Sequence, residues 1–193
     1  MDDALAAAFA DASHFLIETV RLVPPDSWDK PGIGTWTRLE LAAHANRSHT
    51  LLEEYLLRPQ PPQPPDSPYF SAGAIAARGR DAVTALGADP AAAIESASAS
   101  AIGLITATPP DAAIGSPIGT MPLRQYLPSR IAELTIHALD LGQALGAELT
   151  PPPAALQQSL AFAAALAARR ADPAAVLLAL TGRGQLPAGY SVY

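Results

Sequence analysis

The residues best suited to chemistry lie close together in the second half of the chain. Arg130, Glu133, His137 and Asp140 follow one another at intervals of three or four residues. Since an α-helix turns by about 100° per residue, all four positions fall within a stripe about 80° wide. Glu133 and His137 are about one turn apart on this face, a spacing that allows one metal ion to bridge them. The pattern therefore predicts two metal ligands on one helix.

A third ligand has to come from another helix, and the candidates are His14, His44 and His49. His44 shares a helical face with Leu41, Ala45, Ser48, Leu52 and Tyr55. His49 is rotated by about 140° from His44, so the two cannot share one narrow face. We predict that His44 is the inward-facing ligand, with His49 as the alternative. Otherwise His14 and His49 are expected to have structural or surface roles.

The same spacing has a second interpretation. Arg130–Glu133 and Glu133–His137 are also ordinary helix-surface pairs, each contributing about 0.2–0.5 kcal/mol to helix stability. A Glu-x-x-x-His pair without its third ligand is a weak indicator of a metal site. Spacing alone leaves both interpretations open.

The segment that carries this stripe, residues 121–146, is apolar on most of its other sides. Such a helix normally lies inside a core. The stripe is then expected to point into a bundle, where ionisable groups are costly unless they are paired or bound to metal. Pro128 lies inside the segment, so either the helix is kinked there or a short helix over 121–127 precedes the main one.

Apolar residues make up 49% of the chain, and most of them are alanine or leucine. This composition favours helices over strands. Apolar spacing and capping residues predict helices over 2–22, 37–57, 72–86, 89–107, 121–146, 154–169 and 173–180, with a loop that has a little extended structure over 108–120 and a tail over 181–193. In this prediction 72–86 and 89–107 form one broken third helix. The expected fold is all-α, with a four-helix bundle over 1–149 and a short C-terminal helical extension over 150–193.

A proline-rich segment, residues 59–65, connects the second and third helices. It cannot donate enough backbone hydrogen bonds for a helix or a central strand, so an extended polyproline conformation is expected. We interpret it as a stiff crossover between helices. The alternative is that residues 59–68 form a ligand for a proline-binding domain, which would make the chain an interaction protein.

Length, charge and cysteine content exclude several functions. The 193 residues predict one domain with a short appendage, and a net charge of −6 without any basic cluster argues against nucleic acid as a partner. The chain has no cysteine, so a reaction that uses a thiol must take it from outside. The acidic start, Met1-Asp2-Asp3, and the lack of an apolar stretch of about 18 residues predict a cytoplasmic protein without a membrane partner.

Two motifs together resemble the mycothiol-dependent maleylpyruvate isomerase family of the DinB-like metalloprotein superfamily. The residues that carry the resemblance are Trp36-Thr37, His44, Arg130, Glu133, His137, Asp140, Ala144 and Gly146, and the similarity covers roughly residues 1–149. The resemblance implies a four-helix bundle with a divalent metal at one end, ligated by His44, Glu133 and His137. It also implies that residues 150–193 are shorter than the C-terminal domain of the isomerase itself.

Three protein ligands leave one metal position open, as in catalytic zinc sites. The resulting prediction is an isomerase or S-transferase that uses a divalent metal, expected to be Zn²⁺, and mycothiol or a similar low-molecular-weight thiol. The thiolate would attack a small-molecule electrophile. Asp140 and Arg130 are candidates for orienting a ligand, moving a proton or anchoring a carboxylate. The alternative is a non-catalytic helical module that binds a metal or ligand. Either protein is expected to be a monomer or a homodimer.

Overall fold

The computed structural model describes residues 3–170 and 172–192, and most of them are helical. The predicted first helix began at residue 2, which lies outside the described residues, as does the last residue of the predicted tail. The helices are α1 (Asp3–Arg21), α2 (Arg38–Leu57), α3 (Ala72–Asp81), α4 (Pro90–Ala107), α5 (Leu123–Leu145), α6 (Pro153–Ala167) and α7 (Pro173–Leu180). Two short 3₁₀ helices, η1 (Pro68–Phe70) and η2 (Ala82–Leu86), and two strands, β1 (Ala113–Ser116) and β2 (Gly119–Pro122), complete the elements.

Helices α1, α2, α4 and α5 form a four-helix bundle, in which α1 and α2 each pack against both α4 and α5. Their facing sides bury a core of aliphatic and aromatic side chains, of which the largest include Phe9, Leu16, Leu52, Ile105 and Leu134. Burying such side chains is the main source of the stability of a helical bundle. The predicted all-α, DinB-like fold is therefore confirmed.

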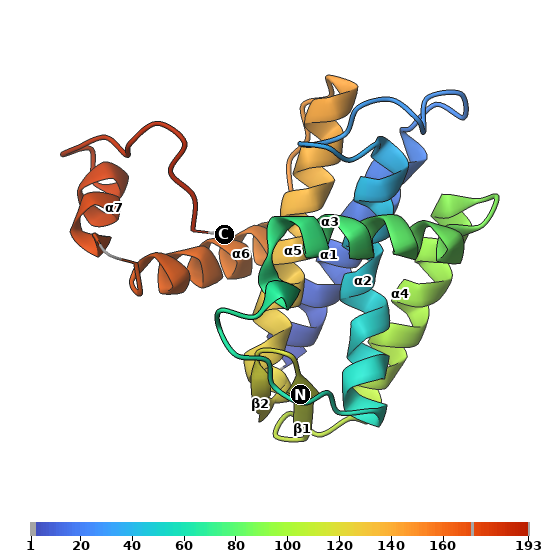
Figure 1. Ribbon diagram of the computed structural model, residues 1–193, viewed down its shortest axis with the longest axis horizontal. Coiled ribbons are helices and arrows are strands. Elements are labelled where there is room, and N and C mark those ends of the chain that lie inside the picture. The colour runs from blue at the N-terminus through green and yellow to red at the C-terminus, as the bar shows by residue number, and fades with distance from the viewer. Residues whose placement is uncertain (1–2, 171, 193) are drawn as a thin grey trace.

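The third bundle helix is α4 alone, and the prediction of one broken third helix over 72–86 and 89–107 was wrong. In Figure 1, α3 runs across α2 and α5, whereas α4 lies along the bundle. The chain changes direction at Gly87, whose φ of 59° favours glycine, and Asp89 then caps α4 by accepting a hydrogen bond from Ala92 N. Gly87 and the Asp89 cap separate α3 from α4, so α3 can run in a different direction and cover one side of the bundle.

Local sequence explains where α2, the first of the two helices that carry the site, begins. The capping box predicted at α2 is present, with Thr37 Oγ1 accepting from Glu40 N and Glu40 Oε2 accepting from Thr37 N. Pro128 lies inside α5, and a single helix continues through it. The alternative of a separate short helix over 121–127 is therefore not what the structure shows.

The proline-rich segment runs beside the β1–β2 hairpin. Gln60 N donates to Gly115 O and Gln63 N donates to Pro117 O. A Cβ placed on Gly115 would lie 2.6 Å from Pro59 Cβ, so only glycine permits this approach. The loop with a little extended structure was expected over residues 108–120, and the hairpin over 113–122 is that structure; residues 121 and 122, expected to begin the helix, belong to β2 instead. The segment thus acts as a crossover within the fold.

The C-terminal helices continue beyond the bundle. The first half of α6 packs against α5 and α1, and α7 lies away from the bundle in Figure 1. Leu177, Leu178 and Leu180 of α7 are exposed. None of the helices in the described part of the chain is long and apolar enough to cross a membrane.

Candidate metal centre

Three of the predicted site residues meet between α2 and α5. His44 comes from α2, and Glu133 and His137 come from α5. Glu133 Oε2 lies 3.2 Å from His137 Nε2 and 3.7 Å from His44 Nε2. One ligand atom from each side chain lies within 4.8 Å of the others. The helical spacing therefore identified side chains that do converge.

The other two predicted residues lie on either side of this cluster. Asp140 Oδ2 accepts a hydrogen bond of 3.0 Å from His137 Nδ1, the ring nitrogen that faces away from Glu133. The Arg130 guanidinium lies over the Tyr126 ring, 5.0 Å from its centroid, and Arg130 Nε donates to Ser129 Oγ. Asp140 thus orients a candidate ligand directly, whereas Arg130 acts on the cluster through its charge.

The remaining histidines are placed elsewhere. His49 is only 1% exposed, with its ring nitrogens 2.9 Å from Asn46 Oδ1 and 3.0 Å from Ser13 Oγ. His14 is exposed on α1. His44, and not His49, therefore shares a site with Glu133, and His49 is a buried structural residue.

The apolar flanks of its helix had suggested that the cluster points into the bundle core. In the structure the cluster lies nearer to the surface. The side chains of His44, Glu133, His137 and Asp140 are 15–21% exposed. These side chains are therefore mostly buried, which strengthens their electrostatic interactions relative to water, and a small part of each remains open to solvent. His44 and Glu133 line a cavity together with Ile75 and Arg78 of α3.

Electrostatics set the protonation of the cluster. Burial alone would raise the pKa of the Glu133 carboxyl, but hydrogen bonds from His137 and His44 and the Arg130 charge hold that pKa well below its usual range. Burial alone would lower the pKa of His137, but its hydrogen bonds to Asp140 and Glu133 raise that pKa to about 9. Burial lowers the pKa of His44. At neutral pH a protonated His137 therefore lies between the carboxyl groups of Glu133 and Asp140. The imidazole of His44 beside them is neutral.

These donors fit a divalent metal ion. Two imidazole nitrogens and one carboxylate oxygen make a ligand set of the catalytic zinc type, which leaves a fourth position open. Two atoms bound at about 2.0–2.1 Å to a tetrahedral ion are about 3.3 Å apart, and the separations from Glu133 Oε2 are 3.2 and 3.7 Å. His137 Nε2 and Glu133 Oε2 are hydrogen-bonded to each other at 3.2 Å, so both atoms would exchange this bond for a bond to the ion. The residues can therefore hold such an ion after small movements.

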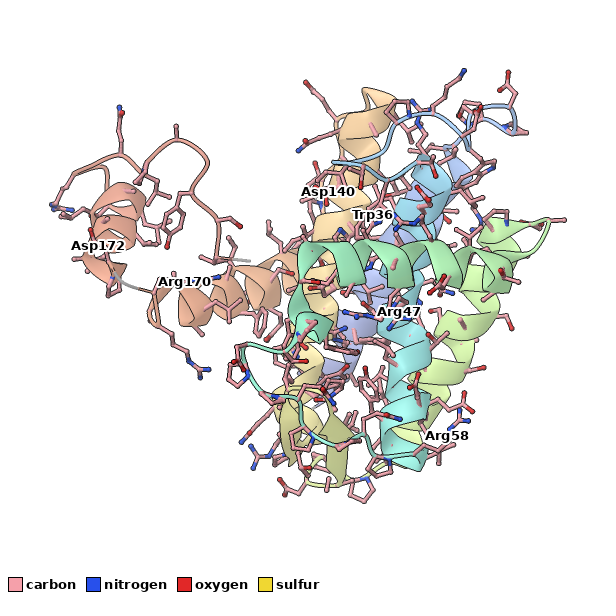
Figure 2. All side chains as sticks on the ribbon, in the orientation of Figure 1. Trp36, Arg47, Arg58, Asp140, Arg170 and Asp172 are labelled. Atoms are coloured by element: carbon pink, nitrogen blue, oxygen red, sulfur yellow. The ribbon has the colours of Figure 1, made fainter. Side chains whose placement is uncertain are left out.

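A cavity of about 380 Å³ adjoins the cluster and was not predicted from the sequence. His44 and Glu133 line it, together with three arginines, Arg47, Arg78 and Arg130, and three tyrosines, Tyr55, Tyr69 and Tyr126. None of these arginines forms an ion pair with a carboxylate in the described part of the chain. Figure 2 shows Arg47 next to α3, with Trp36 and Asp140 at the other side of that helix.

The charge of this cavity indicates what it can bind. Three unpaired guanidinium groups around one space favour an anion, and guanidinium matches carboxylate geometry best. Burial raises the pKa of the Tyr55 and Tyr126 hydroxyls, so both remain neutral hydrogen-bond donors at neutral pH. A second cavity, of about 280 Å³, opens on the His137 side and is lined by Ile33, Glu133, Ile136, His137, Asp140 and Ser191. The cluster is therefore accessible from two sides.

The buried His49 predicts a specific acid sensitivity. Burial lowers its pKa to about 4 in the folded protein, against 6.5 in the unfolded chain. Above about pH 6.5 both states are neutral. As the pH falls from about 6.5 to 4 only the unfolded chain takes up the proton, which reduces the free energy of unfolding by about 3 kcal/mol. We expect His49→Gln to lack this component of the pH dependence in urea denaturation.

The matched control for that measurement is His14→Gln, because His14 is exposed and has no comparable burial. This variant should lose stability on acidification as the wild type does. Equal losses for His49→Gln and His14→Gln between about pH 6.5 and 4 would contradict the structural role assigned to His49.

Together, the bundle and the His–Glu–His cluster at its side define the chain as a DinB-like helical protein with a candidate metal centre. Residues 3–142 match the family model described as the mycothiol maleylpyruvate isomerase N-terminal domain. The chain belongs to this family, as its two motifs had suggested. Neither curated proteins nor solved structures gave a match.

Proposed function

We propose that the protein is a divalent-metal-binding, low-molecular-weight-thiol-dependent isomerase or S-transferase. In this proposal His44, Glu133 and His137 hold the metal, for which Zn²⁺ is the candidate, and mycothiol or a similar thiol is the co-substrate. The observation that carries the proposal is the convergence of these three donors, two of which, His44 and Glu133, line an arginine-containing cavity. Family membership supports the proposal, because the description of the family model names a mycothiol maleylpyruvate isomerase.

The chemistry of a metal-bound thiol supports this reaction. A bound metal ion would lower the pKa of a thiol, which is otherwise near 8.5, so that the thiolate exists at neutral pH. The sequence contains no cysteine, so the thiol has to be supplied as a small molecule. Asp140 keeps the His137 ring in one orientation by accepting from Nδ1–H.

The residues that line the cavity favour a small electrophile with a carboxylate group as the substrate. Arg47, Arg78 and Arg130 can bind that carboxylate, with the tyrosine hydroxyls as further donors. The electrophilic carbon would then lie near the edge formed by His44 and Glu133. The thiolate sulfur would add to a double bond conjugated with a carbonyl group, and the π electron pair would move onto that carbonyl as an enolate, which leaves a carbon–carbon single bond that can rotate. Elimination of the thiolate would then restore the double bond in the isomer, whereas uptake of a proton from water by the enolate carbon would give an S-conjugate.

The alternative of a non-catalytic metal- or ligand-binding module makes a different prediction for the open metal position. We expect the cobalt-substituted protein to change its visible absorption spectrum when 2-mercaptoethanol is added, because a thiolate ligand alters the cobalt geometry and charge transfer. An unchanged spectrum would favour the closed site of the alternative. His44→Ala, which lacks one ligand, is the control and should show neither the cobalt spectrum nor the response.

Activity is tested with the same metal-loaded protein. A panel of thiols and electrophiles, with and without a carboxylate, should show turnover only for pairs that contain both a thiol and a carboxylate-bearing electrophile. Turnover without any thiol would contradict the proposed reaction. Turnover of uncharged electrophiles at equal rates would contradict the role given to the arginines.

A further inference from the structure

The two histidines of the candidate metal centre are oriented by different means. The outward nitrogen of His137 has a carboxylate partner, because its Nδ1 donates to Asp140. The outward nitrogen of His44, Nδ1, is buried and has no hydrogen-bond partner among the described residues. Metal-binding histidines usually donate from their second nitrogen to a fixed acceptor, and this bond sets the ring orientation. Another contact must set it for His44.

The Trp36 indole supplies that contact. Its ring centroid lies 4.4 Å from that of His44, with the ring planes tilted by 34°. The same indole meets His137 edge-on at 6.3 Å, and the two imidazoles are 4.9 Å apart at 83°. A ring-on-ring contact at this distance, although tilted, restricts rotation of the imidazole about its Cβ–Cγ bond. We infer that Trp36 is a positioning residue that holds the His44 ring in its metal-binding orientation by stacking.

Trp36 is itself held in place by α3 and by its own loop. Trp36 Nε1 donates to Ala76 O at 3.3 Å, and the indole lies against Gly79. A Cβ placed on Gly79 would be 3.1 Å from three atoms of the indole, so the helix approaches the ring as closely as glycine allows. The backbone of Trp36 is fixed by Gly32 N, which donates to Trp36 O at 2.8 Å. A rigidly held indole can orient its neighbour.

This inference rests on the proposed metal-binding function, and metal affinity measured by chelator competition tests it. Trp36→Leu removes the flat ring and is expected to weaken Zn²⁺ binding by about 10- to 100-fold, as for loss of a residue that orients a ligand. Trp36→Phe keeps a flat ring and is expected to restore affinity to within about threefold of the wild type. Wild-type affinity in Trp36→Leu would overturn the inference, and so would equal weakening in both variants.

A second measurement leaves Trp36 intact and therefore does not depend on the folding of its variants. In Trp28→Phe protein, Trp36 is the remaining tryptophan. Its fluorescence is expected to change on titration with Zn²⁺, because the stacked His44 ring becomes fixed by the metal, and the midpoint should equal the dissociation constant. Metal binding without a change in Trp36 emission would overturn the inference.

His44→Ala separates failure of this inference from failure of the proposed function. If His44→Ala binds Zn²⁺ as tightly as the wild type, the proposed metal centre is wrong. If His44→Ala loses the metal and Trp36→Leu does not, the metal centre stands and the positioning role of Trp36 is wrong.

Discussion

Glu133→Gln is expected to weaken Zn²⁺ binding a few hundredfold. Glu133 is the only anionic group of the three donors, and its Oε2 lies close to both imidazole nitrogens, at 3.2 and 3.7 Å. Structural zinc sites with four ligands gain about 10–16 kcal/mol, or about 2.5–4 kcal/mol for each ligand. Each 1.4 kcal/mol is a factor of ten in affinity. Glutamine keeps the size of the side chain and removes its charge, so the effect reports on ligation.

Glu53→Gln is the matched control for this substitution. Glu53 lies on α2 and is exposed. Its substitution by glutamine removes the same charge from the protein as Glu133→Gln does. Its affinity for Zn²⁺ should stay within about twofold of the wild type, since a charge exposed to water is largely screened. Similar losses in the two variants, measured by competition with a chromophoric chelator, would show that net charge and not ligation determines binding.

Metal affinity is expected to rise about tenfold per pH unit between about pH 6.5 and 8.5, or about a hundredfold over that range. The reason is the His137 ring, whose pKa is raised to about 9 in the metal-free protein. Below that pH a metal ion must displace the proton on Nε2, so one proton is released for each ion bound. The lowered pKa of His44 means that this ring is already neutral and adds no proton.

Asp140→Asn tests the origin of this pH dependence. The Asp140 carboxylate holds His137 in the protonated form, so without its charge the pKa of His137 falls. The rise of affinity with pH should then level off at a lower pH than in the wild type. A wild-type affinity that is already constant above about pH 7, as for an ordinary imidazole, would contradict the protonation state assigned to the cluster.

The positions on α5 could be predicted because helical periodicity is local information. Spacing of three and four residues places Glu133, His137 and Asp140 on one face whatever the rest of the fold does. The capping box at Thr37 likewise follows from residues that are adjacent in sequence. Choosing His44 over His49 relied on the apolar stripe around His44, although His49 proved to be the more buried of the two.

The cavity could not be predicted in this way. Arg47 and Arg78 reach it because α3 crosses α2, and this crossing depends on packing between segments far apart in the sequence. Tyr69 lies in a 3₁₀ helix after the proline-rich crossover, in which no periodicity indicated a function. The only local signals were Gly87 and the Asp89 cap, which mark the break between α3 and α4 without giving the direction of either helix.

The role of Trp36 could be predicted only in part from the sequence. Its position before the cap of α2 is evident from the sequence, and it belongs to the motif shared with the family. Its contact with His44, eight residues further on, depends on the loop over residues 31–37, where Pro31 and Thr37 form an isolated bridge. Such a loop places a side chain over the first turns of the following helix, and helical spacing does not describe that arrangement.

Anomalous diffraction at the zinc absorption edge, from crystals of the protein loaded with one equivalent of Zn²⁺, would locate the metal directly. We expect one strong peak per chain, about 2.0–2.2 Å from His44 Nε2, Glu133 Oε2 and His137 Nε2. A peak bound by other side chains, or metal-loaded protein with no peak between α2 and α5, would contradict the proposed metal centre.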